Sequence, residues 1–221
     1  MTSSIQPLTD PVIVKYHEQY AALGTQLPGS EQRWVTSLRD QAMLVAARIG
    51  LPTRRVETWK YTDLRPIHRA EFSAVVASDV TAPLLDPYKL DDAFIAVFVN
   101  GCFVPALSQL ENLPEGLEFS SLADALASGV KEPLEGLGDV VELEQPGYAA
   151  LNTVLMQDGG VCRIADNVSV EKPVQFIFVS TENSSVELHL RNLIVAGVNS
   201  KATVMQSFVS LGASSGFSDV V

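Results

Sequence analysis

The sequence contains 221 residues, of which 47% are hydrophobic and 19% charged, and its formal net charge is −11. Such a chain folds into one large domain or two small ones, and its composition excludes an intrinsically disordered protein. The negative charge disfavours binding to nucleic acid or to anionic membranes. The longest apolar run, residues 93–99, is too short to cross a bilayer. Residues 1–7 lack the features of a secretory signal, so we expect a cytoplasmic protein with reduced cysteines at Cys102 and Cys162.

The charge is distributed unevenly along the chain. Residues 1–80 carry nine basic and eight acidic residues, whereas residues 81–221 carry six basic and eighteen acidic ones. Residues 91–145 alone hold eleven acidic residues and one basic residue, which predicts a solvated face with connecting loops.

Two amphipathic helices are predicted before residue 50. Asp10 can cap the first, Pro11 fits its first position and Gly24 ends it. The second is expected to be capped by Ser30 and to end at Gly50. Short connections between such helices favour an antiparallel hairpin. The apolar stripes consist of Ile13, Tyr16, Tyr20 and Leu23, and of Trp34, Leu38, Ala42, Val45 and Ile49.

The segment Gly50–Pro66, called the hinge segment below, combines Trp59 and Tyr61 with four basic residues. One interpretation is that its basic residues hold the acidic surface of a partner; these would be Arg54, Arg55 and Lys60. The favoured interpretation is structural: the two aromatic rings anchor an extended connector, and the basic side chains balance the acidic body.

The middle of the chain predicts a hairpin and two short helices. Asn100-Gly101 separates two apolar runs, which is the strongest local signal for a β-hairpin. Residues 110–118 are expected to form a loop. Ser121 resembles the cap of a helix that ends at Gly129, and residues 148–156 form the second helix.

After Gly159 the sequence predicts many short strands with polar corners, a pattern typical of a β-helix, sandwich or barrel. The corners recur at irregular spacing, so no strict repeat is assigned. The chain ends at Val221 in what is expected to be a strand, and we therefore expect a piece of a longer protein. The predicted strands are residues 161–164, 168–170, 174–179, 186–190, 193–196 and 202–211.

Three separated stretches resemble one known family. The first begins at Gly50 and includes Trp59-Lys60-Tyr61-Thr62. The second is Tyr148–Thr153, followed by Asp158-Gly159-Gly160, and the third is Arg191–Thr203. In this order, over about residues 30–221, the chain resembles SufD-type iron–sulfur cluster assembly proteins of the SufB/SufD family.

The resemblance implies a helical N-terminal domain followed by a right-handed parallel β-helix. We therefore expect a mainly β fold with a helical domain and connector at residues 1–90 and a core at residues 91–221. Within the core, residues 91–157 would form the opening hairpin and short helices. Residues 158–221 would form the first turns of a β-helix that is truncated at its C-terminal end.

The resemblance also implies a non-enzymatic scaffold or accessory subunit of a cytoplasmic Suf complex. Its partners would be a SufB-like paralogous subunit and a SufC-like ATPase. An iron–sulfur cluster is implied for the full complex. None is expected to be bound by this chain, because the family's candidate ligands and its ATPase contact lie beyond Val221. We predict no catalytic residue and no metal ligand, and we assign no cofactor-binding residue. The open strand end is expected to pair with another chain, so a homodimer is also expected.

The three histidines, His17, His68 and His189, show no spacing typical of metal ligands. His189 alternates with two leucines, so we expect it on the surface of a strand whose leucines pack inward. Cys162 is expected to be a small buried residue, and a sulfur or metal contact is the less favoured alternative.

Residues 212–216 match the G-x-S-x-G elbow of serine enzymes, with Ser214 at the nucleophile position. No histidine follows and no helix is predicted there, so a corner between strands is the favoured interpretation. The sequence has no G-x-x-x-x-G-K-[ST] motif, so nucleotide hydrolysis is expected only from a partner.

Two other function classes stay open. A carbohydrate-active β-helix enzyme needs clustered inward-facing carboxylates, whereas the acidic residues after position 157 are expected mostly at corners. A plain protein-binding module would use the basic hinge segment to dock an acidic partner. The acidic residues in question are Asp158, Asp166, Glu171, Glu182, Glu187 and Asp219.

Overall fold

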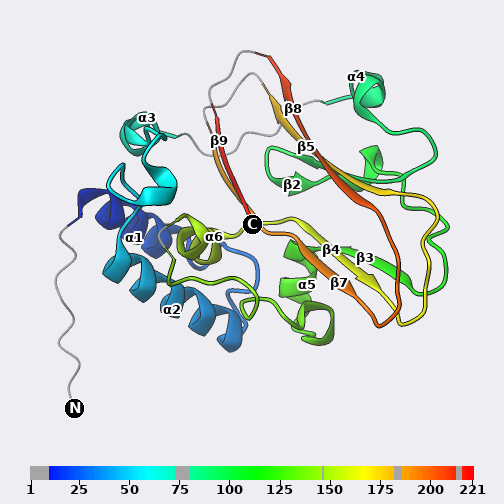
Figure 1. Ribbon diagram of the computed structural model, residues 1–221, viewed down its shortest axis with the longest axis horizontal. Helices are drawn as coiled ribbons and strands as arrows, with labels where there is room; N and C mark the ends of the chain where they lie inside the picture. The colour runs from blue at the N-terminus through cyan, green and yellow to red at the C-terminus, as the bar shows by residue number, and fades with distance from the viewer. Residues whose placement is uncertain (1–9, 73–79, 146, 182–185, 213–215) are drawn as a thin grey trace.

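The two long helices, α1 (Pro11–Leu23) and α2 (Arg33–Ile49), lie on one side of the molecule and the sheets on the other. Helix α6 (Ala149–Leu155) and strand β9 (Phe217–Val220) run between them (Figure 1). The computed structural model describes residues 10–72, 80–145, 147–181, 186–212 and 216–221. None of the helices within these ranges is long and apolar enough to span a membrane.

Helices α1 and α2 form the predicted antiparallel pair. The Asp10 carboxylate caps α1 by accepting a hydrogen bond from the Val12 amide at 2.9 Å, and Gly50 ends α2 with a φ of 69°. The Tyr20 hydroxyl, late in α1, donates to Asp40 in the first half of α2 at 2.9 Å. At the other end, Asp10 lies beside Gly50.

The details of α2 differ from the prediction. The helix begins at Arg33 without a side-chain cap, and the Ser30 hydroxyl donates to the Thr25 carbonyl instead. Of the predicted stripe, only Ala42 belongs to the buried face of α2, and the other buried residues lie one position further along the chain. This face packs against α6. Arg39 lies in this face and donates to the carbonyls of Pro28 and Met156 at 2.9 and 3.0 Å, so a charged side chain joins the core. The buried residues of α2 are Val35, Arg39, Ala42, Met43 and Ala46.

The middle of the chain contains the predicted hairpin of β1 (Phe94–Val99) and β2 (Cys102–Phe103), which are antiparallel. Positive φ angles of 47° and 84° at Asn100 and Gly101 make its tight turn. Helix α5 (Leu122–Ser128) is capped by Ser121 as predicted. Strand β3 (Leu117–Ser121) begins inside the expected loop, because it pairs with a distant strand.

Short helical elements connect these parts. They are η1 (Glu57–Trp59), α3 (Arg65–Arg69), α4 (Ala82–Leu85), η2 (Asp86–Tyr88), η3 (Pro105–Leu107) and η4 (Glu132–Leu134).

The last third of the chain makes two turns that stack on each other. The first consists of β4 (Gly160–Ile164), β5 (Val174–Thr181) and β6 (Glu187–Leu190), and the second of β7 (Leu193–Ala196), β8 (Val204–Leu211) and β9. Each strand of the first turn pairs in parallel with its counterpart in the second. Within the described ranges the strands form sheets of order β2-β1-β5-β8, β3-β4-β7 and β6-β9.

The register of these pairs reveals a repeat that the corner residues do not show. Val174 lies opposite Val204 and Glu187 opposite Phe217, so each strand recurs about 30 positions later. Equivalent rings therefore stack: Phe178 lies between Phe98 and Phe208, with ring centroids 4.9 and 5.2 Å apart. Helices and stacked strands share the chain, so the structure is mixed rather than mainly β.

Gly159 lies just before β4, where its backbone closely approaches Arg191 in the link between the first and second turns. Its φ is 154°, and a Cβ atom there would lie 2.0 Å from the Arg191 carbonyl oxygen. We expect Gly159→Ala to lower the free energy of unfolding by about 3 kcal/mol, because neither backbone can move without breaking the register. Urea denaturation followed by circular dichroism measures the loss.

The matched control for this substitution is Gly136→Ala. Gly136 also has a positive φ, 92°, but no atom lies within 4 Å of the added methyl group. This variant should lose only about 1 kcal/mol, the cost of the backbone conformation itself. Equal losses in the two variants would show that the close approach at Gly159 does not matter.

Candidate functional site

Two of the three stretches that carry the family resemblance meet at the junction of α6 with β6 and β9. The Arg191 guanidinium donates to Asn152 Oδ1 at 2.9 Å and to Thr153 Oγ1 at 2.5 Å. The Asn152 amide donates in turn to the carbonyls of Leu190 and Asp219, at 2.9 and 3.0 Å. One buried amide on α6 thus bonds to the backbone of both turns.

Arg191 is only 2% exposed. Burial lowers its pKa to about 10, against the opposing effect of the Asp219 charge. The guanidinium therefore remains charged at neutral pH and contributes a buried positive charge to the junction.

The start of the stacked turns is held by a second set of bonds. The Asp158 carboxylate accepts hydrogen bonds from the backbone amides of Phe103, Ala123 and Gly159, at 2.8 to 3.0 Å. Asn192 Oδ1 accepts one from the Gly160 amide at 2.8 Å. These residues of the resemblance connect elements of the fold.

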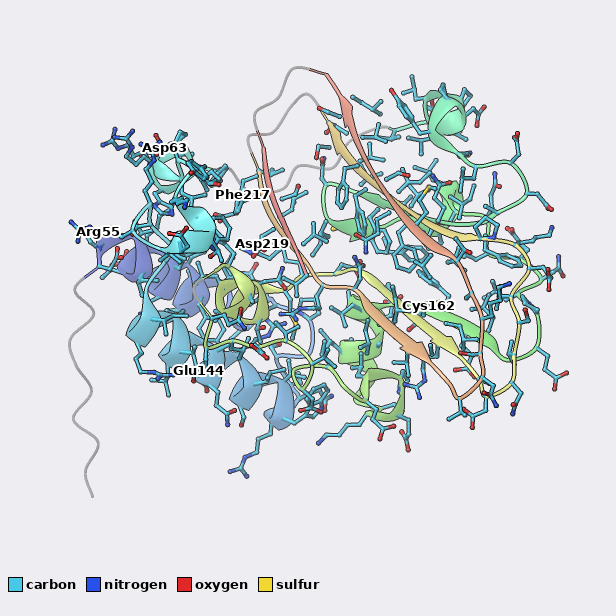
Figure 2. The ribbon with its side chains drawn as sticks, viewed as in Figure 1. Arg55, Asp63, Glu144, Cys162, Phe217 and Asp219 are labelled. Carbon is cyan, nitrogen blue, oxygen red and sulfur yellow. The ribbon has the colours of Figure 1, made fainter. Side chains whose placement is uncertain are left out.

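A buried cluster of titratable side chains lies on the helix-facing side of β6 and β9. His189 Nδ1 is 3.2 Å from an oxygen of Asp219, and its Nε2 is 3.5 Å from Glu187 Oε1. The Tyr16 hydroxyl of α1 donates to the same Glu187 oxygen at 2.5 Å. Tyr16, Glu187, His189 and Asp219, which we call the His189 cluster, are at most 7% exposed. Figure 2 shows Asp219 on β9, at the boundary with the helices.

The charges of the cluster set its pKa values. Burial opposes protonation of His189, but the hydrogen bond to Asp219 and the contact with Glu187 outweigh it and raise the pKa of the imidazole. Burial also opposes ionisation of Glu187, yet His189 and the Tyr16 hydroxyl lower the pKa of this carboxyl. Burial, followed by the charge of Glu187, raises the pKa of Tyr16, so its hydroxyl remains a donor. Because its four side chains are at most 7% exposed, the cluster is a buried network with little room for a substrate.

The structure contradicts the expected surface position of His189. The predicted alternation is correct, since Leu188 and Leu190 pack between the sheets while His189 points the other way. That other side is covered by α1 and not by water, and His189 is 1% exposed. Glu187 and Asp219 also differ from the expected placement, because they lie on β6 and β9 and not at corners. The missed signal is the register, which places His189 directly opposite Asp219.

The hinge segment packs against this junction through one aromatic ring. The rings of Trp59 and Tyr148 meet edge to face at 6.1 Å, and Tyr148 lies 5.3 Å from the ring of Phe217 on β9. His68 Nε2 is 2.9 Å from the Tyr148 hydroxyl. The anchoring predicted for Trp59 is confirmed, whereas that predicted for Tyr61 is wrong, because Tyr61 is 88% exposed.

The other candidate residues are dispersed. His17 is exposed on α1, and Cys102 is exposed on β2. Cys162 is buried on β4 as predicted, and burial raises the pKa of its thiol to about 11. Residues 213–215 of the G-x-S-x-G match lie outside the described residues. In the part of the chain that the structure describes, no group of three or more His, Cys, Asp or Glu residues could hold a metal ion.

The His189 cluster predicts a specific dependence of stability on pH. A raised histidine pKa stabilises the fold below the ordinary value of about 6.5, and this contribution is lost as the pH rises through the folded pKa. The lowered pKa of Glu187 stabilises the fold above about 4.5 and is lost as the pH falls. We expect His189→Gln to cost about 3 kcal/mol near pH 6, because it leaves buried carboxylates unpaired. The cost should shrink at higher pH, as measured by urea denaturation at several pH values.

His17→Gln is the control, since His17 is exposed on α1, the same helix that covers the cluster. Its stability profile should follow that of the unmodified chain. Parallel profiles for His189→Gln and the unmodified chain would contradict the assigned role of His189.

Comparison with known proteins places the chain in a family. Residues 12–176 match the family described as SufBD protein N-terminal region. A SufBD family iron–sulfur cluster assembly protein of Synechocystis sp. is 26% identical over 218 residues, which are 94% of this chain and 48% of the relative. The iron–sulfur cluster assembly protein SufD of Escherichia coli is 26% identical over 93% of this chain and 44% of its own length.

SufD of Bacillus subtilis is 25% identical over 81% of this chain and 42% of its own length. The chain thus spans a little less than half the length of these curated relatives. Because the family match extends over most of its residues, the chain belongs to the SufBD family, and it is of the SufD type.

Proposed function

We propose that this chain serves iron–sulfur cluster assembly as a non-enzymatic scaffold subunit of a cytoplasmic Suf-type complex. Its partners are a SufB-like paralogous subunit and a SufC-like ATPase, and the cluster is the cargo that the complex builds. Membership of the SufBD family supports this role, as do relatives whose names describe iron–sulfur cluster assembly. The proposal includes the fold: the two stacked turns are the start of a right-handed parallel β-helix.

The observation that carries the proposal is the open face of the second turn. Strands β7, β8 and β9 each lie at the edge of their sheet within the described ranges. Their free backbone groups face the same way, because all three pair in parallel with the first turn. Large apolar side chains on and beside these strands are exposed, including Phe208 at 57% and Val198 at 69%. Such an edge is a template for a further strand layer.

The buried networks also favour assembly over catalysis. The His189 cluster holds two carboxylates and a histidine, but Tyr16 of α1 covers it. A carbohydrate-active enzyme needs carboxylates that reach a substrate, and Glu187 and Asp219 are each 7% exposed. In this proposal the partner ATPase supplies the energy of nucleotide hydrolysis.

The test is co-purification of the chain with the SufB-like and SufC-like proteins of the same genome. We expect a complex with at least one of them. Phe208→Asp should weaken it by tenfold or more, because a charge would replace a central exposed ring of the open face. Pull-down combined with calorimetry measures the affinity.

Leu44→Asp is the control, because Leu44 is 63% exposed on α2, away from the second turn. Met205→Asp is a second variant of the same face, since Met205 lies on β8 and is 41% exposed. It provides the test if Phe208→Asp fails to fold. A chain that binds neither protein, or that binds equally well with Phe208→Asp and Met205→Asp, would refute the proposed scaffold role.

A further inference from the structure

The outer side of the hinge segment contains a groove of about 430 Å³. Its lining consists of residues 52–55, residues 62–65 and His68. We call it the basic groove, because Arg54, Arg55 and Arg65 line it. In Figure 2, Arg55 and Asp63 lie on the side of the molecule away from the sheets.

The positive charge of this groove is only partly neutralised. Asp63 is engaged by Arg65 at 2.6 Å, and hydrogen bonds from that guanidinium hold the pKa of Asp63 well below its usual range. Glu57 forms an ion pair with Lys60. Among the described residues Arg54 and Arg55 form no ion pair, although the chain as a whole carries a net charge of −11. The charge of Arg54 also acts on Asp63 and helps to lower its pKa, but neither Arg54 nor Arg55 has an ion-pair partner of its own among the described residues.

An exposed aromatic residue, Tyr61, directly precedes the groove residue Thr62 in the sequence. Tyr61 is 88% exposed, and Lys60 Nζ lies 5.1 Å from the centre of its ring. Tyrosine and arginine are among the residues most enriched at the energetic centres of protein interfaces, whereas isolated exposed apolar residues carry no such meaning. The hinge segment combines both residue types on one short stretch that also packs against the core through Trp59.

We propose that the basic groove and Tyr61 form a docking site for an acidic segment of a partner protein. Guanidinium groups bind carboxylates through paired hydrogen bonds, so Arg54 and Arg55 can hold successive acidic side chains while Tyr61 packs against the apolar part of the segment. Repulsion between two chains of net charge −11 disfavours a second copy as the occupant of this groove. This site does not depend on the proposed scaffold role.

The docking site also contacts the stacked turns. His68 lines the groove, and its Nε2 is within hydrogen-bond distance of the Tyr148 hydroxyl. The ring of Tyr148 in turn packs on Phe217 of β9. Burial lowers the pKa of His68 in the free protein, the charge of Asp10 opposes this, and Lys15 adds to it. Carboxylates bound in the groove would favour the imidazolium form of His68. Binding of the partner should therefore raise the pKa of His68, whose ring contacts Tyr148 at the junction with β9.

The test uses a short, fluorescently labelled peptide of glutamate and leucine, titrated into the whole chain at low salt. Arg54→Ala combined with Arg55→Ala should weaken binding by about threefold to thirtyfold, the range that two exposed ion pairs give. Arg33→Ala combined with Lys201→Ala is the control, since both residues are exposed and the change in net charge is the same. Equal weakening in the two double variants would overturn the site.

Further arms separate the sources of negative charge. Tripolyphosphate, or vesicles containing phosphatidylglycerol, should compete poorly; displacement of the peptide by either at lower concentration would overturn the assignment to a protein segment. Light scattering tests whether a second copy of this chain occupies the groove. Self-association that Arg54→Ala abolishes would overturn the assignment to a different protein. Tyr61→Ser should weaken peptide binding without affecting binding of tripolyphosphate.

Nuclear magnetic resonance of the His68 ring gives a readout that a structural role alone would not move. Saturation with the peptide should raise the pKa of His68. No change at His68 upon saturation would show that the peptide binds outside the groove.

Discussion

The parallel register of the two stacked turns depends on contacts from outside the sheets, and the Asn152 amide is the clearest of them. It bonds to one carbonyl in each turn, at Leu190 and Asp219, and Arg191 fixes its orientation. An unpaired buried amide or carbonyl costs about 1–3 kcal/mol, so a slipped register would leave several such groups unsatisfied. The junction with the helices therefore determines how the second turn is placed on the first.

The placement of charge follows from the same junction. Glu187 and Asp219 can be buried because His189 lies between them and because Tyr16 donates to Glu187. Buried charges are tolerated only when paired, and pairing here requires β6, β9 and α1 together. The cluster consequently favours one docked position of the N-terminal helix. The two surfaces that we propose for binding partners, the open face and the basic groove, lie outside this cluster.

Local signals were sufficient for much of the fold. Asp10, Ser121 and Gly50 marked helix ends, and Asn100 marked a hairpin, because each acts on its own backbone neighbours. The positions of His189 and Tyr61 could not be predicted in the same way. Alternation along a strand says which side a residue faces, but not whether water or a helix covers that side. The family resemblance was recognisable because its residues hold the junction, while the repeat of about 30 residues required knowledge of the register.

The aromatic column Phe98–Phe178–Phe208 has a consequence for how the chain acquires its structure. Phe98 belongs to a hairpin whose strands are joined by two residues, so it can form early and with little loss of chain entropy. The first turn can then condense on that ring, and the second turn on the first. Such layer-by-layer growth resembles nearest-neighbour cooperativity in repeat proteins, where order spreads outward from one seed.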